Sequence, residues 1–322
     1  MVEADCREWR EGRMTPQKGE RWDTSILPQV HQTVVHVLAD AAARSGDATA
    51  LVCGDRQFNY AQYLRCVAGF AHELVSLGAR GSRVALVCGN SIDMPIAMFA
   101  AHASGAQAVP INPTYTAREL SHILGDAEVR VVVYDDEIAG TIEPLCASLG
   151  IAHRVRIGGP GGRSLDLWKD VPALALPEPL PNAADLATLQ YTGGTTGLPK
   201  GVNITHGQMA VNISQREAGL PTRPDDERIL CMMPLFHVFA VAMCLHLSAY
   251  CRGKLVIMPR YKPEVLLELI TCERITRLPA GPTVFIGLLA HENFARTDFS
   301  SLRTAYSGSA PLPEETIKRW RE

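Results

Sequence analysis

A glycine- and threonine-rich segment with one lysine, Gln190–Asn203, holds the residues best suited to chemistry. From Thr192 to Gly201 it contains four glycines, three threonines and Lys200. Glycines let a backbone bend sharply beside a ligand, and successive N–H groups in such a bend form a nest for an anion. Threonine hydroxyls add donors, and the lysine adds a positive charge. The segment therefore predicts a phosphate-binding loop, with an ordinary flexible turn as the alternative.

The spacing differs from that of the two common nucleotide-binding motifs. A triphosphate-binding P-loop needs glycine before its lysine and serine or threonine after it, whereas Pro199 and Gly201 flank Lys200. The dinucleotide-binding spacing G-x-G-x-x-G does not occur in this segment. A different kind of phosphate-binding loop is therefore expected.

Three further segments place reactive or small residues after an apolar run. In Met233–Ala240, His237 follows a predicted strand, where it is either a functional group or an ordinary histidine at a helix start. In Tyr306–Pro313, small residues either let a flat ring lie close to the backbone or form a tight turn before a helix. The small residues of Leu278–Val284 are a weaker candidate for a pocket wall.

These segments resemble those of one family. Thr-Gly-Gly-Thr-Thr-Gly-Leu-Pro-Lys-Gly, which begins at Thr192, is similar to the signature of the adenylate-forming (AMP-binding) enzymes, here the large N-terminal domain of fatty-acid and aryl-acid acyl-CoA synthetases. Pro-Leu-Phe-His-Val-Phe, with His237, resembles the segment that borders their acyl pocket. Tyr306–Pro313 resembles their Ser-Gly-Gly-Ala-Pro segment, which contacts adenine and the acyl carboxylate, with Ser309 in place of the second glycine.

The resemblance implies roles for individual residues. Lys200 and His237 are the predicted catalytic residues, and Thr196 is the predicted metal ligand. The residues predicted to bind the nucleotide are Thr192, Gly193, Gly194, Thr195, Thr196, Gly197, Lys200, Ser307, Gly308, Ser309, Ala310 and Pro311. The residues predicted to line the substrate pocket are Phe236, His237, Phe239, Ala280, Gly281, Thr283 and Gly308.

In this family a carboxylate attacks ATP to give an acyl adenylate and pyrophosphate, and coenzyme A then displaces AMP. The resemblance implies ATP and Mg²⁺ as cofactors and coenzyme A as a cosubstrate. The apolar residues near His237 and Phe285 favour a hydrophobic acid, with medium- or long-chain fatty acids first and aryl acids next. Two alternatives stay open: adenylation for another acceptor, such as a carrier protein, and a non-catalytic nucleotide-binding module.

Alternating strands and helices must position these segments. Apolar runs such as Arg83–Cys88 and Val129–Tyr134 read as buried strands, each followed by a helical pattern, whereas Ile275–Pro279 reads as a turn. The alternation predicts an α/β fold with two doubly wound, mostly parallel sheets packed together. Ligands of such sheets bind beyond the carboxyl ends of the strands. The glycine-rich loop follows the strand Leu186–Tyr191, so it lies where a ligand is expected. The N-terminus of the following helix, 206–218, is expected to point back at that loop.

A glycine- and proline-rich stretch between two alternating halves predicts the domain division. We expect an irregular lead-in at 1–35, a first α/β subdomain at 36–185, and a second at 186–322 that carries the signature loop. The resemblance further implies that a C-terminal part with a metal-binding glutamate and a catalytic lysine would follow Glu322. The chain is therefore expected to be a truncated fragment with little or no ligase activity of its own.

Composition and charge narrow the class of protein. The 31 basic and 34 acidic side chains form no block of like charge, which argues against binding to nucleic acid or to an anionic membrane. The nine cysteines include no C-x-x-C pair, which favours buried thiols in a reducing compartment over metal ligands or disulfides. No apolar stretch is long enough for a signal peptide or a membrane span, so we predict a cytoplasmic protein that acts on small molecules.

Overall fold

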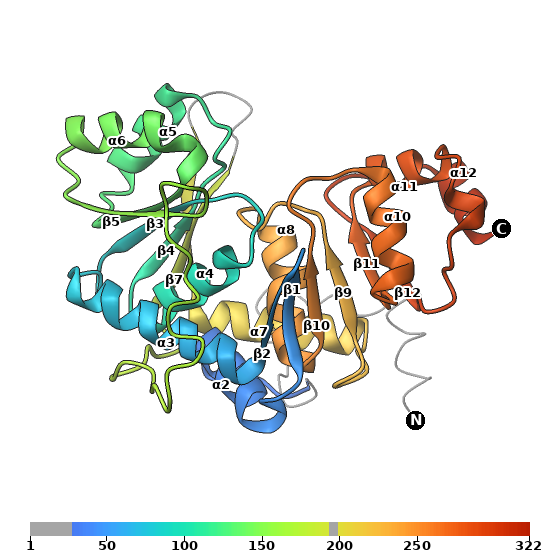
Figure 1. Ribbon diagram of the computed structural model, residues 1–322, viewed down its shortest axis with the longest axis horizontal. Helices are drawn as coiled ribbons and strands as arrows, with labels where there is room; N and C mark the ends of the chain where they lie inside the picture. Colours follow the sequence, from blue (N-terminus) through green and yellow to red (C-terminus); the bar gives the residue numbers. More distant parts are fainter. Residues whose placement is uncertain (1–27, 193–198) are drawn as a thin grey trace, which may run out of the picture.

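Two sheets of six strands each form the centre of the molecule (Figure 1). A computed structural model describes residues 28–192 and 199–322. The sheets lie side by side, and helices cover both faces of each (Figure 1). The predicted class, two doubly wound and mostly parallel sheets packed together, is confirmed. Within these residues, none of the helices has the length and apolar character that a membrane span requires.

The first sheet has the strand order β6–β5–β3–β4–β7–β8, and only β8 runs antiparallel to its neighbour. Its strands are β3 (Arg83–Val87), β4 (Gln107–Pro110), β5 (Val131–Asp135), β6 (His153–Ile157), β7 (Leu186–Thr192) and β8 (Lys200–Thr205). The helices on its faces are α3 (Tyr60–Ser76) and α4 (Asp93–Ala103) on one side, and α5 (Ala117–Asp126) and α6 (Ala139–Ser148) on the other (Figure 1). Val84 and Leu86 pack with the α3 and α4 side, whereas Ala85 and Val87 pack with the α5 and α6 side. Burial on both faces explains why the central strands β3 and β5 are nearly continuous apolar runs.

The second sheet has the order β12–β11–β9–β10–β1–β2, and only β2 runs antiparallel to its neighbour. Its strands are β1 (Thr49–Cys53), β2 (Arg56–Asn59), β9 (Arg228–Cys231), β10 (Lys254–Ile257), β11 (Arg277–Ala280) and β12 (Thr304–Ser307). The helices on its outer side are α10 (Pro263–Cys272), α11 (Pro282–Leu289) and α12 (Glu314–Arg321) (Figure 1). Short 3₁₀ turns occur at η2 (Asp136–Ile138) and η4 (Phe294–Arg296).

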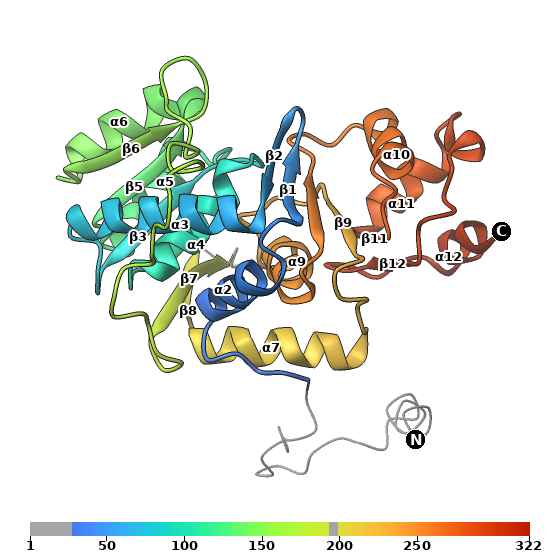
Figure 2. The same ribbon diagram turned by 60° about the horizontal axis from the view of Figure 1, so that its bottom comes forward.

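A layer of shared helices joins the two sheets. It contains α2 (Val34–Ser45), α3, α4 and one continuous helix made of α8 (Val238–Ala240), the π-helical turn η3 (Val241–His246) and α9 (Leu247–Cys251). One apolar cluster includes Leu38 of α2, Phe70 of α3 and Phe99 of α4 together with Leu86 and Leu255 of the two sheets. Figure 2 shows α7 (His206–Gly219) beside α2 on the outside of this layer. The sheets therefore share one core.

Each sheet takes strands from both halves of the sequence. The β1–β2 hairpin belongs to the second sheet, because Leu51 and Val52 pair in parallel with Leu255 and Val256 of β10. Conversely, β7 and β8 complete the first sheet, where Ala108 of β4 pairs with β7. The predicted boundary between residues 185 and 186 therefore does not coincide with the division between the sheets.

Two local predictions are wrong. The stretch Ile275–Pro279, predicted as a turn, contains most of strand β11, and Pro279 is accommodated because β9 pairs with β11 only at Arg277. The start of α7 does not point at the glycine-rich segment, because β8 runs the length of the sheet between them. The backbone N–H of His206 instead donates to Asp185 at the opposite end of β7.

Candidate functional site

The β7–β8 hairpin brackets the predicted phosphate-binding loop. Thr192 ends β7 and Lys200 begins β8, and the two residues pair across the hairpin. The Thr192 hydroxyl lies 3.5 Å from the Lys200 carbonyl oxygen, and both residues are exposed. The other predicted loop residues, including the predicted metal ligand, lie outside the described residues: Gly193, Gly194, Thr195, Thr196 and Gly197. The hairpin thus presents Lys200 at the carboxyl end of β7.

Two side chains of α5 hold the hairpin at the end where the loop begins. The Tyr191 hydroxyl donates to the Asp126 carboxylate, and His122 Nε2 lies 3.2 Å from the Pro199 carbonyl oxygen. Burial and the hydrogen bond to Asp126 raise the pKa of Tyr191, so its hydroxyl stays protonated and remains a donor. The sequence alone does not reveal these two anchors, because each lies more than sixty residues from its partner.

The turn that carries His237 is held from the other sheet. Asn90, in the loop after β3, donates from Nδ2 to the carbonyl oxygens of Met233 at 3.0 Å and Met258 at 3.2 Å. Its Oδ1 accepts from the backbone N–H of Leu235 at 2.8 Å. These three bonds tie the carboxyl ends of β9 and β10 to the first sheet. Asn90 was not among the predicted site residues, since nothing in its local sequence marks it.

His237 itself begins the helix that follows this turn. Its Nδ1 accepts from the backbone N–H of Phe239 at 3.2 Å, so the ring acts as a helix N-cap. In its neutral form the ring therefore carries its proton on Nε2. The side chain is exposed, and its Nε2 makes no hydrogen bond within residues 28–192 and 199–322.

Several of the predicted pocket residues come together here. The backbone N–H of Gly308 donates to the carbonyl oxygen of Ala280 at 3.0 Å. A Cβ on Gly308 would lie only 2.2 Å from the Phe239 ring, so this ring packs directly against the glycine backbone. Gln190 of β7 donates to the Phe236 carbonyl oxygen at 3.4 Å. The ends of β7, β9, β11 and β12 therefore meet at one edge.

The remaining predicted residues lie around this edge with fewer contacts. Gly281 is buried at the start of α11, whereas Thr283 is exposed in its first turn and makes no hydrogen bond to the other site residues that the structure describes. The Ser307 hydroxyl is buried and has no hydrogen-bond partner among residues 28–192 and 199–322. Ala310 and Pro311 are exposed. The pocket wall is thus best defined at Phe239, Ala280 and Gly308.

Ser309 adopts a backbone conformation that favours glycine, with a φ of 69°. We expect Ser309→Gly to raise the free energy of unfolding by about 1 kcal/mol, because glycine occupies the left-handed region without the steric penalty of a Cβ. Thermal unfolding followed by circular dichroism would measure this gain as a higher midpoint. Ser300→Gly is the control, since Ser300 has no positive φ and should lose stability slightly. A lower midpoint for Ser309→Gly would contradict the expectation.

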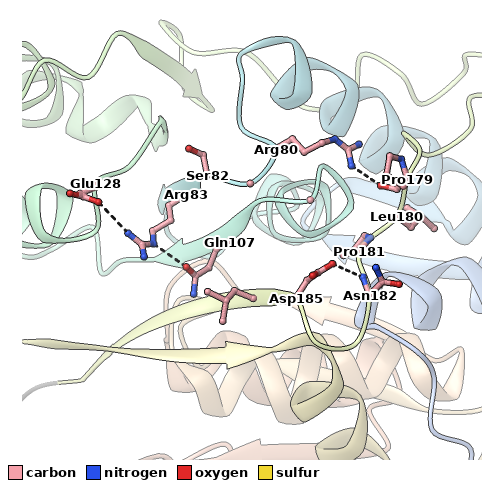
Figure 3. A pocket seen from close by; sticks show the side chains of 13 residues that line it. Arg80, Ser82, Arg83, Gln107, Glu128, Pro179, Leu180, Pro181, Asn182 and Asp185 are labelled. Atoms are coloured by element: carbon pink, nitrogen blue, oxygen red, sulfur yellow. Dashed lines mark hydrogen bonds and ion pairs between the residues drawn. The ribbon is translucent and has the colours of Figure 1, made fainter.

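The opposite edge of the first sheet carries a separate cavity of about 580 Å³ (Figure 3). Its charged groups are already engaged with the protein. Arg80 donates to the carbonyl oxygen of Pro179, and Arg83 donates to Gln107 (Figure 3). Arg83 also donates to the carbonyl oxygen of Ala127. Strands β3, β4 and β7 begin here rather than end. This cavity is therefore separate from the edge at which the carboxyl ends of β7, β9, β11 and β12 meet.

The described residues offer no metal site of their own. Within 28–192 and 199–322, no group of three or more His, Cys, Asp or Glu side chains is placed to hold a metal ion. The predicted Mg²⁺ ligand, Thr196, lies outside these ranges. The Mg²⁺ assignment therefore stays a prediction.

Comparison with known proteins shows the family that this chain resembles. The family profile described as AMP-binding enzyme matches residues 38–322. The long-chain-fatty-acid–CoA ligase of Salmonella typhimurium is 30% identical over 330 residues, which cover 92% of this chain and 59% of that protein. The chain thus spans less than two thirds of the length of that relative.

Two solved structures share the fold closely. The inhibitor-bound N-terminal domain of FACL13 from Mycobacterium tuberculosis has a TM-score of 0.82 and 32% identity, and the match covers 90% of this chain and 73% of that one. The anthranilate CoA ligase AuaEII in complex with anthranoyl-AMP has a TM-score of 0.84 and 27% identity, covering 93% and 59%. The match of the family profile over most of the sequence shows that this chain belongs to the family of AMP-binding enzymes.

Proposed function

We propose that this chain supplies the binding site for ATP and a hydrophobic carboxylic acid in a protein that forms an acyl adenylate, the first half of an acyl-CoA ligase reaction. One observation carries the proposal: the Lys200 hairpin, the His237 turn, Ala280 and Gly308 meet at the carboxyl ends of four strands. This is the edge at which doubly wound sheets bind ligands. A lysine suited to phosphates and an exposed histidine lie together at this edge, which suits the binding of a nucleotide beside an acid.

Formation of an acyl adenylate requires positive charge near the phosphates, where Lys200 is proposed to lie. A carboxylate oxygen forms a bond to the α-phosphorus of ATP, and the bond from that phosphorus to the bridging oxygen of the departing pyrophosphate breaks. Two anions approach each other, and negative charge builds on the leaving group. Lys200 would stabilise that charge from the base of the loop. His237, fixed by its bond to the Phe239 N–H, would border the acyl carboxylate.

Mg²⁺ and coenzyme A extend this proposal. Mg²⁺, when bound, would shield the charge of the phosphates. It stays a prediction from the family resemblance, with Thr196 as its predicted ligand. Coenzyme A is proposed as the final acceptor, because the Salmonella typhimurium relative and AuaEII are both named CoA ligases. A cytoplasmic location likewise stays a prediction.

A cavity beside the site supports a hydrophobic acid. It has a volume of about 280 Å³ and opens next to Gln190 and Val238, which neighbour the hairpin and His237. Most of its lining is apolar: Met98, Pro110, Ile204, Met209, Val238, Val241 and Ala242. A fatty acid is proposed first, in line with the named relative, and an aryl acid second, in line with the anthranoyl-AMP complex.

Pyrophosphate release from a panel of carboxylic acids tests the proposal. The full gene product should release pyrophosphate with ATP and a fatty acid, and coenzyme A should raise turnover by removing the adenylate. Release that is stimulated by a phosphopantetheinylated carrier protein and not by coenzyme A would favour the alternative acceptor. If ATP binds but no acid yields pyrophosphate, the chain would be a nucleotide-binding module without this activity.

A further inference from the structure

One face of helix α5 contacts the β7–β8 hairpin at two points close to Lys200. Asp126 accepts a hydrogen bond from the Tyr191 hydroxyl of β7, and His122 Nε2 lies 3.2 Å from the carbonyl oxygen of Pro199, just before β8. His122 and Asp126 are four residues apart, and residues at this spacing lie on the same face of a helix. A single helix face therefore holds one residue from each side of the hairpin.

Helix α5 is itself firmly placed against the first sheet. Three of its apolar residues lie in the buried cluster that also contains Leu189 and Tyr191 of β7: Leu120, Ile123 and Leu124. A capping box between Thr116 and Glu119 closes the start of the helix. Because it is packed along its length and capped at its start, α5 provides a fixed point from which side chains can hold the hairpin.

The contact with His122 bears directly on the position of Lys200. The Pro199 carbonyl group and the Lys200 nitrogen belong to one planar peptide unit, so a hydrogen bond to that oxygen also restrains the Cα of Lys200. Pro199 has no backbone N–H and lies outside the strand pairing, which ends with Thr192 and Lys200. Within residues 28–192 and 199–322, His122 is its hydrogen-bond partner. Because a carbonyl oxygen only accepts, the ring carries its proton on Nε2.

The effect of Lys200 depends on where its backbone is anchored. The side chain is exposed at the carboxyl end of β7, where the phosphates of ATP are proposed to bind. A lysine ammonium is a compact charge on a flexible stem of four carbons, so the protein controls its reach mainly through the backbone. A misplacement of about 1 Å can slow a reaction by about a hundredfold, so a bond that restrains this backbone bears on the rate.

We propose that His122 is a positioning residue for adenylate formation: it donates to the Pro199 carbonyl oxygen and so holds Lys200 against the departing pyrophosphate. This inference rests on the proposed function, because it assumes that Lys200 faces the phosphates of ATP. Asp126 holds the opposite strand of the hairpin through Tyr191. Thioester formation, in which no pyrophosphate departs, should not depend on His122.

His122→Phe tests the proposal, because phenylalanine keeps a ring and removes the donor. In the full gene product this variant should slow pyrophosphate release at saturating ATP about three- to tenfold, the effect of one lost hydrogen bond. Thioester formation from a synthetic acyl adenylate should keep its rate. His122→Gln should recover most of the lost rate, since its side-chain amide can donate to the same carbonyl oxygen.

A double variant separates the positioning of Lys200 from a general structural role. If His122 acts through Lys200, adding His122→Phe to Lys200→Ala should slow pyrophosphate release no further, within about twofold, because the positioned group is already absent. Losses that multiply in full would show that His122 acts independently of Lys200 and would overturn the proposal.

The matched control is His72→Phe. His72 Nε2 lies 3.0 Å from the carbonyl oxygen of Ala175, so the variant removes the same kind of contact from α3, and pyrophosphate release should keep its rate. Three results would overturn the proposal and leave the proposed function intact: equal slowing by the two phenylalanine variants, no slowing by His122→Phe, or a His122→Gln variant as slow as His122→Phe. A wild-type protein that binds ATP and releases no pyrophosphate with any acid would overturn both.

Discussion

Lys200→Ala is expected to slow acyl-adenylate formation by about a hundredfold and to leave thioester formation nearly unchanged. Lys200 begins β8, exposed at the mouth of the hairpin that brackets the predicted phosphate loop. Its charge would stabilise the departing pyrophosphate, which is present only in the first half-reaction. Rapid-quench measurement of pyrophosphate release in the full gene product measures the first step. Thioester formation from a synthetic acyl adenylate measures the second.

The matched control for this experiment is Lys318→Ala. Lys318 is 62% exposed and forms a surface ion pair with Glu314 in α12, so its removal should change neither rate. Equal slowing of the two half-reactions by Lys200→Ala would contradict a role in pyrophosphate departure. It would indicate instead that the lysine holds the nucleotide in both steps.

Asn90→Ala should be the most destabilising of the proposed substitutions, with a loss of about 3 kcal/mol in the free energy of unfolding. Three backbone groups, on Met233, Leu235 and Met258, would lose their partner, and a buried group left unpaired costs about 1–3 kcal/mol. Because the same bonds hold the turn before His237, adenylate formation should also fall roughly tenfold. Urea unfolding and pyrophosphate release measure the two effects.

Asn90→Asp tests the hydrogen bonds alone, because aspartate has nearly the same size as asparagine. The aspartate keeps an acceptor for the Leu235 N–H but turns an oxygen toward two carbonyl oxygens, so the loss should be at least as large as for alanine. Asn293→Ala, at an exposed position whose side chain makes no cap bond, should stay within about 0.5 kcal/mol of the wild type. A harmless Asn90→Asp would show that the loop after β3 does not hold the His237 turn.

Much of the fold could be predicted because its signals are local. Strand β3 shows its burial as a continuous apolar run, and α7 spans His206–Gly219, close to the helix expected at 206–218. Strand β11 could not be read in this way, because Pro279 is a poor strand former whose place at a weakly paired position depends on β9. The position of the β1–β2 hairpin was equally hidden, since its partner β10 lies about 200 residues further along the chain.

In the candidate site, too, residues with a local sequence signal could be predicted and residues with long-range contacts could not. His237, Phe239 and Gly308 could be predicted because each lies in a short segment whose composition stands out, and the structure brings Phe239 against Gly308. The residues that hold the site in place could not be predicted from the sequence. Asn90, His122 and Asp126 acquire their roles only when the topology brings distant segments beside them. The π-helical turn at Val241–His246 also follows from packing rather than from any residue pattern.

The pairing of β1 with β10 has a consequence for how the protein is made. At a synthesis rate of about 5–20 residues per second, Leu51 leaves the ribosome roughly 10–40 s before Leu255. During that interval the edge of β1 that will pair with β10 has no partner strand, and an unpaired strand edge promotes aggregation. We therefore expect the nascent chain to depend on chaperones until β10 has emerged, and a gene split between codons 185 and 186 to yield two insoluble products.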